Sequence, residues 1–391
     1  MKRKSGLTPS IHSQDTIRFP LHRLPARPAE VLRLNGLCPY YTMFPLDFPF
    51  KQLSKAKPGD WVFDPFCGRG TTNFAARLRG LPSVGIDSNP VAAAIAAAKF
   101  VDVEPIDIAK ECKNILADDL EPEDIPEGRF WDLCFHPLTL KQICNLREEL
   151  LKECSTDIRI ALRALLLGIL HGPLRKGLPA YFSNQMPRTY GTKPNSAIRF
   201  WEKRQLFPNE IDVAEVVDRR AHYTFSHLPP ASDGMILQVD SRDAIDNLIP
   251  ARFKWVITSP PYYGMNSYFP DQWLRNWFMG GESSVNYTHD RQISHTSELK
   301  FIEGLSQVWK RTAEVCVPGA HLIIRFGALP SLACNPTLLL KESLKKADCG
   351  WKVKKTMNAG HAAHGKRQSE QFRQNLGNAL DEIDIHAVLE R

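Results

Sequence analysis

Several features that would assign this chain to a class at once are missing from its sequence. The nine cysteines are scattered and form no CxxC pair, so neither a zinc site nor a disulfide framework is expected. The longest apolar run, at 91–100, is too short and too alanine-rich to cross a membrane. The basic start, MKRKSGLTPS, has no apolar stretch behind it and therefore does not predict a signal peptide.

The composition is that of an ordinary globular protein. The 391 residues are enough for one large domain or two ordinary ones, and 43% hydrophobic with 24% charged residues is typical of a soluble chain. The net charge of +7 is compatible with a polyanionic partner but does not require one. An odd number of scattered thiols is typical of a reducing compartment, which predicts a cytoplasmic location.

The most informative stretch is KWVITSPPYYG, at 254–264. Its apolar, β-branched run predicts a buried strand, which must end at Pro260 and Pro261 because proline fixes φ and donates no backbone hydrogen bond. The result is a rigid corner at the carboxyl end of a strand, where ligands bind in open α/β sheets. The corner carries the hydroxyl group of Ser259, the carbonyl group of Pro260 and the aromatic ring of Tyr262.

Such a corner suits methylation of an exocyclic amino group on a nucleobase. That nitrogen is a poor nucleophile because its lone pair is delocalised into the ring. Two acceptors, Ser259 Oγ and the Pro260 carbonyl, would hold the two amino protons and turn the lone pair toward a methyl donor. Tyr262 would stack on a base taken out of its helix. The alternative is a Pro-Pro turn that only ends an ordinary strand.

A second motif lies upstream, in GDWVFDPFCGRGTTNFAARLRG at 59–80. It predicts a strand at 61–63, a tight glycine loop at 64–70 and a helix that begins at Thr71. No GK[ST] follows and GxGxxG is incomplete, which excludes a Walker loop and the full dinucleotide motif. The next strand ends at Asp87, where a carboxylate can accept hydrogen bonds from a ribose; helix capping is the alternative.

The segments around these motifs are less specific. Aromatic residues and prolines alternate at 38–53, which predicts a loop with a buried aromatic side, either a hydrophobic plug or a lid over a cofactor. Helical periodicity dominates 105–232 and interrupts the alternation of strands and helices. Within it, 172–194 interleaves basic and aromatic residues, as a nucleic-acid-binding face does, although a solvated surface would look the same.

The alternation then resumes. A strand that begins at 235 ends in Asp240, which could accept a hydrogen bond from an adenine amino group, while Ser241 and Asp243 could instead cap a short helix. We further predict helices at 297–317 and 335–349 and strands at 321–327, 351–360 and 383–390.

With DPFCGRGTT at 64–72, GIDSNP at 85–90 and SPPY at 259–262, the chain resembles the amino-group DNA methyltransferases that use S-adenosylmethionine. Serine in the first position of SPPY is similar to the N4-cytosine group, whereas the N6-adenine group more often carries aspartate there. The resemblance implies an α/β fold of the Rossmann-like methyltransferase type, with a mostly parallel seven-stranded sheet and a helical insertion.

The resemblance also implies an organisation into parts. These parts are an N-terminal arm at 1–37, the cofactor-binding first part of the methyltransferase domain at 38–104, a mostly helical insertion at 105–232 as the candidate target-recognition region, and the catalytic second part at 233–391. The segment CPYYTMFP, at 38–45, looks like the family's methionine-binding segment.

The expected site residues fall into three groups, and no metal is expected. The cofactor-binding residues are Phe44, Asp64, Pro65, Phe66, Gly68, Gly70, Thr71, Asp87 and Asp240. The catalytic residues are Ser259, Pro260, Pro261 and Tyr262. The candidate DNA-binding residues are Arg175, Lys176, Arg188, Lys193, Lys366 and Arg367.

The expected activity is N4-cytosine methylation of duplex DNA, with no membrane partner. By family analogy alone, its context would be restriction–modification or defence, with cognate proteins as partners. The sequence argues against methylation at carbon 5, because no Pro-Cys pair supplies a nucleophile. The alternatives are N6-adenine methylation, N2 methylation of RNA guanosine, whose enzymes usually carry Asp before Pro-Pro-Tyr and an N-terminal RNA-binding domain, and a catalytically silent scaffold.

Overall fold

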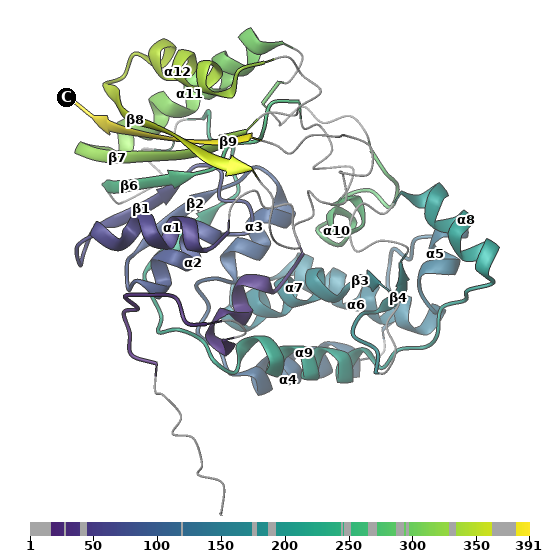
Figure 1. Cartoon of the computed structure of the whole chain (residues 1–391). Coiled ribbons are helices and arrows are strands. Elements are labelled where there is room, and N and C mark those ends of the chain that lie inside the picture. The colour runs from purple at the N-terminus through teal and green to yellow at the C-terminus, as the bar shows by residue number, and fades with distance from the viewer. Residues whose placement is uncertain are drawn as a thin grey trace, which may run out of the picture.

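The structure is a computed structural model of the whole chain (Figure 1). It describes residues 17–26, 29–39, 45–118, 120–173, 178–186, 193–243, 245, 252–264, 272–286, 293–294, 297–327, 334–361 and 381–391. None of the helices in these ranges combines the length and the apolar character that crossing a membrane requires.

One seven-stranded sheet, in the order β5-β2-β1-β6-β7-β9-β8, forms the centre of the fold. Its strands are β1 Trp61–Asp64, β2 Ser83–Ile86, β5 Gly234–Leu237, β6 Phe253–Thr258, β7 Cys316–Gly327, β8 Trp351–His361 and β9 Asp381–Leu389. Strand β9 is antiparallel to both of its neighbours, and the other neighbouring pairs are parallel. This order is that of the Rossmann-like methyltransferase fold, so the predicted fold class is confirmed.

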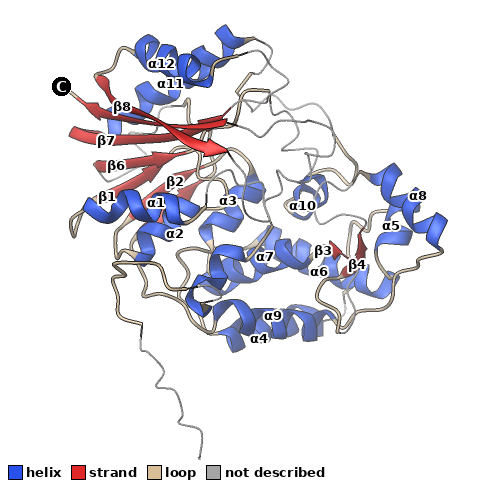
Figure 2. Ribbon diagram, viewed as in Figure 1, coloured by secondary structure: helices blue, strands red, loops and turns tan. Residues whose placement is uncertain are grey.

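Helices cover both faces of the sheet, as Figure 2 shows. Because successive side chains of a strand point to opposite faces, Val62 and Ile257 belong to one core, whereas Phe63 and Val256 belong to the other. The first core lies against α1 Asp47–Gln52, α2 Thr71–Leu78 and α3 Pro90–Ala97, and the second against α11 Glu298–Val315 and α12 Pro336–Ala347.

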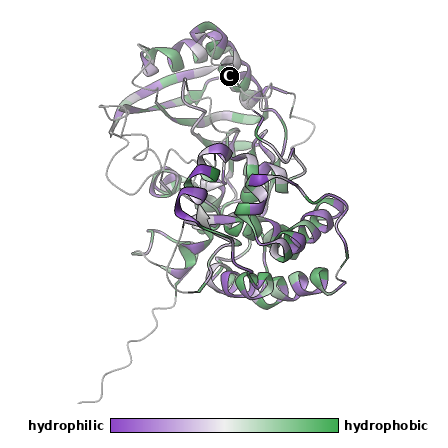
Figure 3. Cartoon of the chain, turned by 90° about the vertical axis from the view of Figure 1, so that its right-hand side faces the viewer, coloured by the Kyte–Doolittle hydropathy of each residue, from purple (hydrophilic) through white to green (hydrophobic). Residues whose placement is uncertain are grey.

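A largely helical segment separates β2 from β5. It consists of α4 Pro105–Ala117, α5 Arg129–Cys134, α6 Pro137–Lys152, α7 Asp157–Ile169, α8 Pro194–Arg204 and α9 Val213–Phe225, with a two-stranded sheet of β3 His171–Pro173 and β4 Ser183–Met186. Hydrophilic and hydrophobic residues alternate along these helices (Figure 3). Their apolar faces join the same core as α2 and α3. The division of the chain at 105 and 232 stays a prediction.

The expectation of a loop throughout 38–53 was wrong, because residues 47–52 form α1 and a 3-10 turn, η2 Leu53–Lys55, follows. Pro49 lies in the first turn of the helix, where the backbone N–H has no partner to lose. Arg79 holds the end of this helix: its Nη2 donates to the Phe50 carbonyl at 2.9 Å, and its guanidinium lies 3.8 Å from the centre of the Phe50 ring.

A buried arginine ties the helical segment to the sheet. Arg77, in α2, donates from Nη1 to the carbonyls of Lys99 at 2.8 Å and Val101 at 2.9 Å. Its Nε and Nη2 donate to the carbonyls of Pro230 at 3.0 Å and Pro229 at 2.6 Å. These carbonyls lie where the chain leaves the sheet after α3 and where it returns before β5. Burial lowers the pKa of Arg77 to about 10, although the charges of Asp102 and Asp157 oppose the shift, so the guanidinium stays charged.

Candidate active site

The two sequence motifs meet in the middle of the sheet because β1 and β6 are neighbours. Asp64 ends β1, and Thr258 ends β6. Thr258 Oγ1 donates to Asp64 Oδ1 at 2.6 Å, and the N–H of Phe66 donates to the same oxygen at 3.1 Å. One buried carboxylate therefore holds both the glycine loop and the Ser-Pro-Pro corner at the carboxyl ends of their strands.

Two glycines give the loop its shape. Gly68 and Gly70 have φ of +52° and +77°, a region that favours glycine. A Cβ at Gly70 would also lie 3.0 Å from the Cα of Ala96, so a side chain does not fit there. Gly70 is the N-cap of α2, and within the described residues no side chain caps this helix. The positive end of α2, which begins at Thr71, therefore points toward the loop.

Asp87 stands at the end of β2 beside this loop. Its Oδ2 accepts from the N–H of Gly68 at 3.0 Å, and its Oδ1 accepts from the N–H of Asn89 at 2.9 Å. Helix α3 is capped by Asn89, whose side chain accepts from the N–H of Val91 at 3.0 Å, so Asp87 is not the cap. Each carboxylate oxygen can accept a further hydrogen bond, which leaves Asp87 able to bind a hydroxyl group.

Both carboxyl groups have pKa values far above the ordinary range of aspartate. Burial raises the pKa of Asp64 to about 6, against hydrogen bonds from Thr258, Thr72 and Phe66, and the nearby Asp87 adds to the rise. Burial likewise raises the pKa of Asp87 to about 6, although the N–H groups of Asn89 and Gly68 stabilise its charged form. A positively charged ligand beside either group would favour ionisation.

Ser259 begins the corner after β6. Its Oγ is buried and has no hydrogen-bond partner in the part of the chain that the structure describes. A buried hydroxyl without a partner costs free energy. Ser259 Oγ is thus a donor and acceptor that is available to a bound ligand, as its expected role requires.

Tyr262 is placed differently from what its expected role requires. Its ring is 0% exposed and packs edge-on against Phe326, with 5.6 Å between the ring centroids. Its hydroxyl donates to Glu382 Oε1 at 2.9 Å, and a Cβ at Gly327 would lie 2.6 Å from the ring. In this conformation neither face of the ring is open to a base, so stacking would require the ring to leave this socket.

The loop after β5 also contacts the glycine loop. Ser241 Oγ donates to the Pro65 carbonyl, so Ser241 anchors this loop on the glycine loop. Asp240 is held by Arg242, whose Nε lies 2.9 Å from Oδ1 and whose Nη2 lies 2.5 Å from Oδ2. Nothing in the sequence pattern pointed to Arg242 as its partner. The short helix expected after Asp243 falls largely outside the described residues.

The remaining predicted residues are peripheral or cannot be placed. Lys193 is exposed at the start of α8, and the same helix exposes further cations, Arg199, Lys203 and Arg204. Figure 1 shows α8 at the end of the helical segment that is remote from the sheet. Outside the described residues lie Phe44, Arg175, Lys176, Arg188, Lys366 and Arg367.

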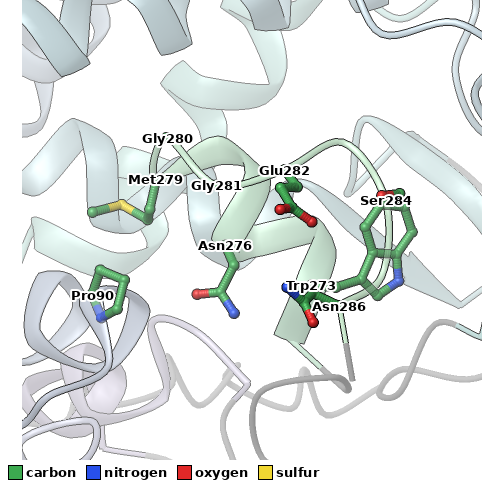
Figure 4. A pocket seen from close by; sticks show the side chains of 9 residues that line it. All are labelled: Pro90, Trp273, Asn276, Met279, Gly280, Gly281, Glu282, Ser284 and Asn286. Atoms are coloured by element: carbon green, nitrogen blue, oxygen red, sulfur yellow. The ribbon is translucent and has the colours of Figure 1, made fainter. Parts of the chain in front are cut away.

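A pocket of about 320 Å³ opens between the start of α3 and α10 Trp273–Phe278 (Figure 4). Pro90 forms one wall, and the side chains of Asn276 and Glu282 lie around its middle. Its described lining contains no lysine or arginine, so its chemistry suits a neutral, hydrogen-bonding group better than a phosphate. The pattern of the sequence did not indicate this pocket, because its lining comes from segments far apart in the chain.

Two residues of the site escaped sequence reasoning. Thr258 was read as one more β-branched residue of the strand; the signal that was overlooked is a hydroxyl group at the strand end, directly before the corner. Glu382 had no local signal at all, because its partner Tyr262 is 120 residues away in the sequence.

Comparison with known families supports the assignment of the glycine loop. A family model described as DNA methylase matches residues 43–98, which include the glycine loop and Asp87. No curated protein sequence matches the chain.

Solved structures overlap the chain only loosely. TrmN from Thermus thermophilus has a TM-score of 0.35 and 10% identity over 92% of this chain and 53% of its own, so this chain spans about half of that protein. The rRNA methyltransferase aviRa from Streptomyces viridochromogenes has a TM-score of 0.33 and 11% identity over 90% and 88% of the two chains. The fold assignment rests on the strand order instead.

The socket of Tyr262 gives a testable prediction. Replacing Glu382 by leucine leaves the buried hydroxyl without its acceptor, so Glu382→Leu should lower the free energy of unfolding by about 1–3 kcal/mol. Adding Tyr262→Phe should then cost less than it does in the wild-type protein, because the hydroxyl has already lost its acceptor. Urea denaturation of the two single variants and the double variant measures this coupling.

A matched control is Glu390→Leu, which removes an exposed carboxylate paired with Lys354 and should change stability by no more than about 0.5 kcal/mol. Strictly additive effects of Tyr262→Phe and Glu382→Leu would show that the two side chains are not coupled.

Proposed function

We propose that the protein is an S-adenosylmethionine-dependent methyltransferase that methylates the exocyclic N4 amino group of cytosine in duplex DNA. The observation that carries this proposal is the buried hydroxyl of Ser259, which finds no partner among the described residues and is held beside the glycine loop by the bond from Thr258 to Asp64. The match of residues 43–98 to the DNA methylase family supports the same reading.

The methyl donor is S-adenosylmethionine, which supplies a methyl group on a positively charged sulfur. The residues present fit such a ligand. Asp87 can accept from the ribose hydroxyls, the glycine loop admits a close approach of ligand and backbone, and Asp240, held by Arg242, is the proposed acceptor for the adenine amino group. Two carboxylates beside the loop, Asp64 and Asp87, favour a cationic ligand and disfavour a polyphosphate.

The chain itself contributes orientation and hydrogen bonding. Ser259 Oγ and the Pro260 carbonyl accept hydrogen bonds from the two amino protons of the target base. This contact directs the nitrogen lone pair away from the ring plane and toward the methyl donor. Because Pro260 and Pro261 fix the corner, the two acceptors keep their geometry before the base arrives.

The proposed substrate is DNA because the chain carries a net charge of +7 and exposes cations along α8. The choice of cytosine rests on serine, instead of aspartate, as the first residue of the corner. A restriction or defence partner is proposed from family analogy alone.

The decisive experiment identifies the product. The protein is incubated with S-adenosylmethionine and duplex DNA of mixed sequence or, in a parallel reaction, RNA, and the digested nucleosides are analysed by mass spectrometry. We expect N4-methylcytosine. N6-methyladenine would keep the mechanism and overturn the base assignment. Unmodified DNA together with a methylated guanosine in RNA would move the activity to RNA.

Ser259→Ala should lower the rate of methyl transfer on the order of 10- to 1000-fold, the range for loss of one positioned hydrogen-bonding group. The affinity for S-adenosylmethionine should change little, because the proposed contact is with the base. Ser306→Ala, which removes a hydroxyl bonded within α11, is the matched control and should retain the wild-type rate. An unchanged rate in Ser259→Ala would remove Ser259 from the mechanism.

Cofactor affinity should depend on pH through Asp64 and Asp87. Their pKa of about 6 means that both are protonated below pH 6 in the free protein, whereas the cationic ligand binds best to the ionised forms. Affinity measured by calorimetry should therefore change little between pH 7.5 and 6.5 and fall below pH 6, by roughly tenfold per pH unit for each group that must ionise.

Asp87→Asn should bind S-adenosylmethionine more weakly at pH 7.5, and its affinity should depend less steeply on pH, because one titrating group is gone. Identical pH profiles for this variant and the wild-type protein would exclude Asp87 from the ligand site.

A further inference from the structure

A second buried guanidinium lies on α10, in the segment that follows the Ser-Pro-Pro corner. Arg275 is 1% exposed. Its Nε donates to the Leu167 carbonyl at 2.8 Å, and its Nη1 donates to Gln272 Oε1 at 2.6 Å. Its Nη2 has no partner among the described residues. Arg77 shows the contrast, because all of its guanidinium nitrogens donate to carbonyl groups.

Two neighbouring side chains also have a buried polar atom without a hydrogen-bond partner. Gln272 Nε2 and His171 Nδ1 are buried without a partner in the described part of the chain, and these side chains are 1% and 3% exposed. Burial and the charge of Arg275 lower the pKa of His171 well below its ordinary value, so the imidazole is neutral. No carboxylate of the described residues pairs with Arg275. An uncompensated buried charge is costly, and a guanidinium fork matches the geometry of a carboxylate.

Packing connects this cluster to the glycine loop. Leu167, which accepts from Arg275, precedes Gly168, and a Cβ at Gly168 would lie 2.3 Å from the carbonyl oxygen of Leu37 and 3.3 Å from the Cα of Cys38. Leu37 directly follows the 3-10 helix η1 Glu30–Gly36. Leu37 and Cys38 therefore pack directly on α7, one residue from the carbonyl that Arg275 binds.

On its other side, η1 contacts Lys99, which packs against the glycine loop. The carbonyl of Leu34 accepts from Lys99 Nζ at 2.5 Å, and Lys99 Cγ lies 3.0 Å from where a Cβ of Gly70 would stand. Lys99 is 0% exposed, and no described carboxylate pairs with it. The thiol of Cys38 feels the positive charge of Arg275, Lys99 and Arg69, which opposes the rise of its pKa by burial. Burial lowers the pKa of Lys99 to about 7, so the positive charge between α10 and the glycine loop comes mainly from Arg275 and Arg69.

We propose that Arg275, with Gln272 beside it, binds the carboxylate group at the methionine end of S-adenosylmethionine. This inference rests on the proposed function and assigns one contact within it. A carboxylate completes the hydrogen bonding of Arg275 Nη2 and Gln272 Nε2 and neutralises the buried charge. A phosphate of a DNA strand does not suit this place, because the two side chains are only 1% exposed.

The test compares two ligands by calorimetry: S-adenosylmethionine and its decarboxylated analogue, which retains the adenosine and the sulfonium but lacks the carboxylate. The wild-type protein should prefer the intact cofactor by roughly 10- to 100-fold, the value of a charge-assisted contact. Arg275→Met should lose this preference by binding the intact cofactor more weakly while its affinity for the analogue stays nearly unchanged. Arg275→Lys, which keeps the charge, should retain part of it.

Lys346→Met, which removes an exposed cation on α12, is the matched control and should keep the wild-type preference. Gln272→Leu provides a second variant if Arg275→Met does not fold, and it should reduce the preference in the same direction.

The possible outcomes distinguish failure of the carboxylate contact from failure of the proposed function. A wild-type protein that binds both ligands equally, or an Arg275→Met variant that weakens both equally, would overturn the carboxylate contact and leave the proposed function standing. A folded wild-type protein that binds neither ligand would overturn the proposed function itself.

Discussion

The site depends on one hydrogen bond between two strand ends, from Thr258 Oγ1 to Asp64 Oδ1 at 2.6 Å. Parallel strands end at the same edge of a sheet, so the pairing of β1 with β6 brings the glycine loop and the Ser-Pro-Pro corner together. Without that bond, each motif would still follow its own strand. Because the bond is present, a shift of the corner moves Asp64. Asp64 also accepts from the N–H of Phe66, so the glycine loop moves with it.

The parts of the site that the sequence predicted are those set by short-range chemistry. The corner at Pro260, the left-handed Gly70 and the carboxylate of Asp87 at the end of β2 are each specified by their immediate neighbours. The parts that could not be predicted depend on partners far along the chain. Arg275 meets Leu167 across 108 residues, and Tyr262 meets Glu382 across 120. The same limit hid α1, where burial of Phe48 and Phe50 outweighs the loop propensity of proline.

The helical segment is attached to the site at more than its two chain connections. Arg77 bonds the carbonyls at both connections, and Arg275 bonds a carbonyl near the end of α7. These bonds are buried, so breaking them would expose charged groups to a medium of low dielectric constant. The bond from Arg275 to the Leu167 carbonyl therefore links the position of α7 to that of α10, the helix that follows the Ser-Pro-Pro corner. If residues 105–232 recognise the target, as proposed, these bonds would couple that recognition to the site at the strand ends.

The distribution of charge around the loop narrows the kind of ligand that fits. Asp64 and Asp87 lie at the strand ends with pKa values of about 6, which is where a cation gains most from their ionisation. Arg275 and Lys99 lie on opposite sides of residues 34–38, and no described carboxylate pairs with either. A nucleoside triphosphate would place its negative charge against the two aspartates. A zwitterion with a cationic centre suits the two aspartates, and its distal carboxylate suits Arg275. The charges around the loop therefore agree with the methyl donor that the glycine loop suggests.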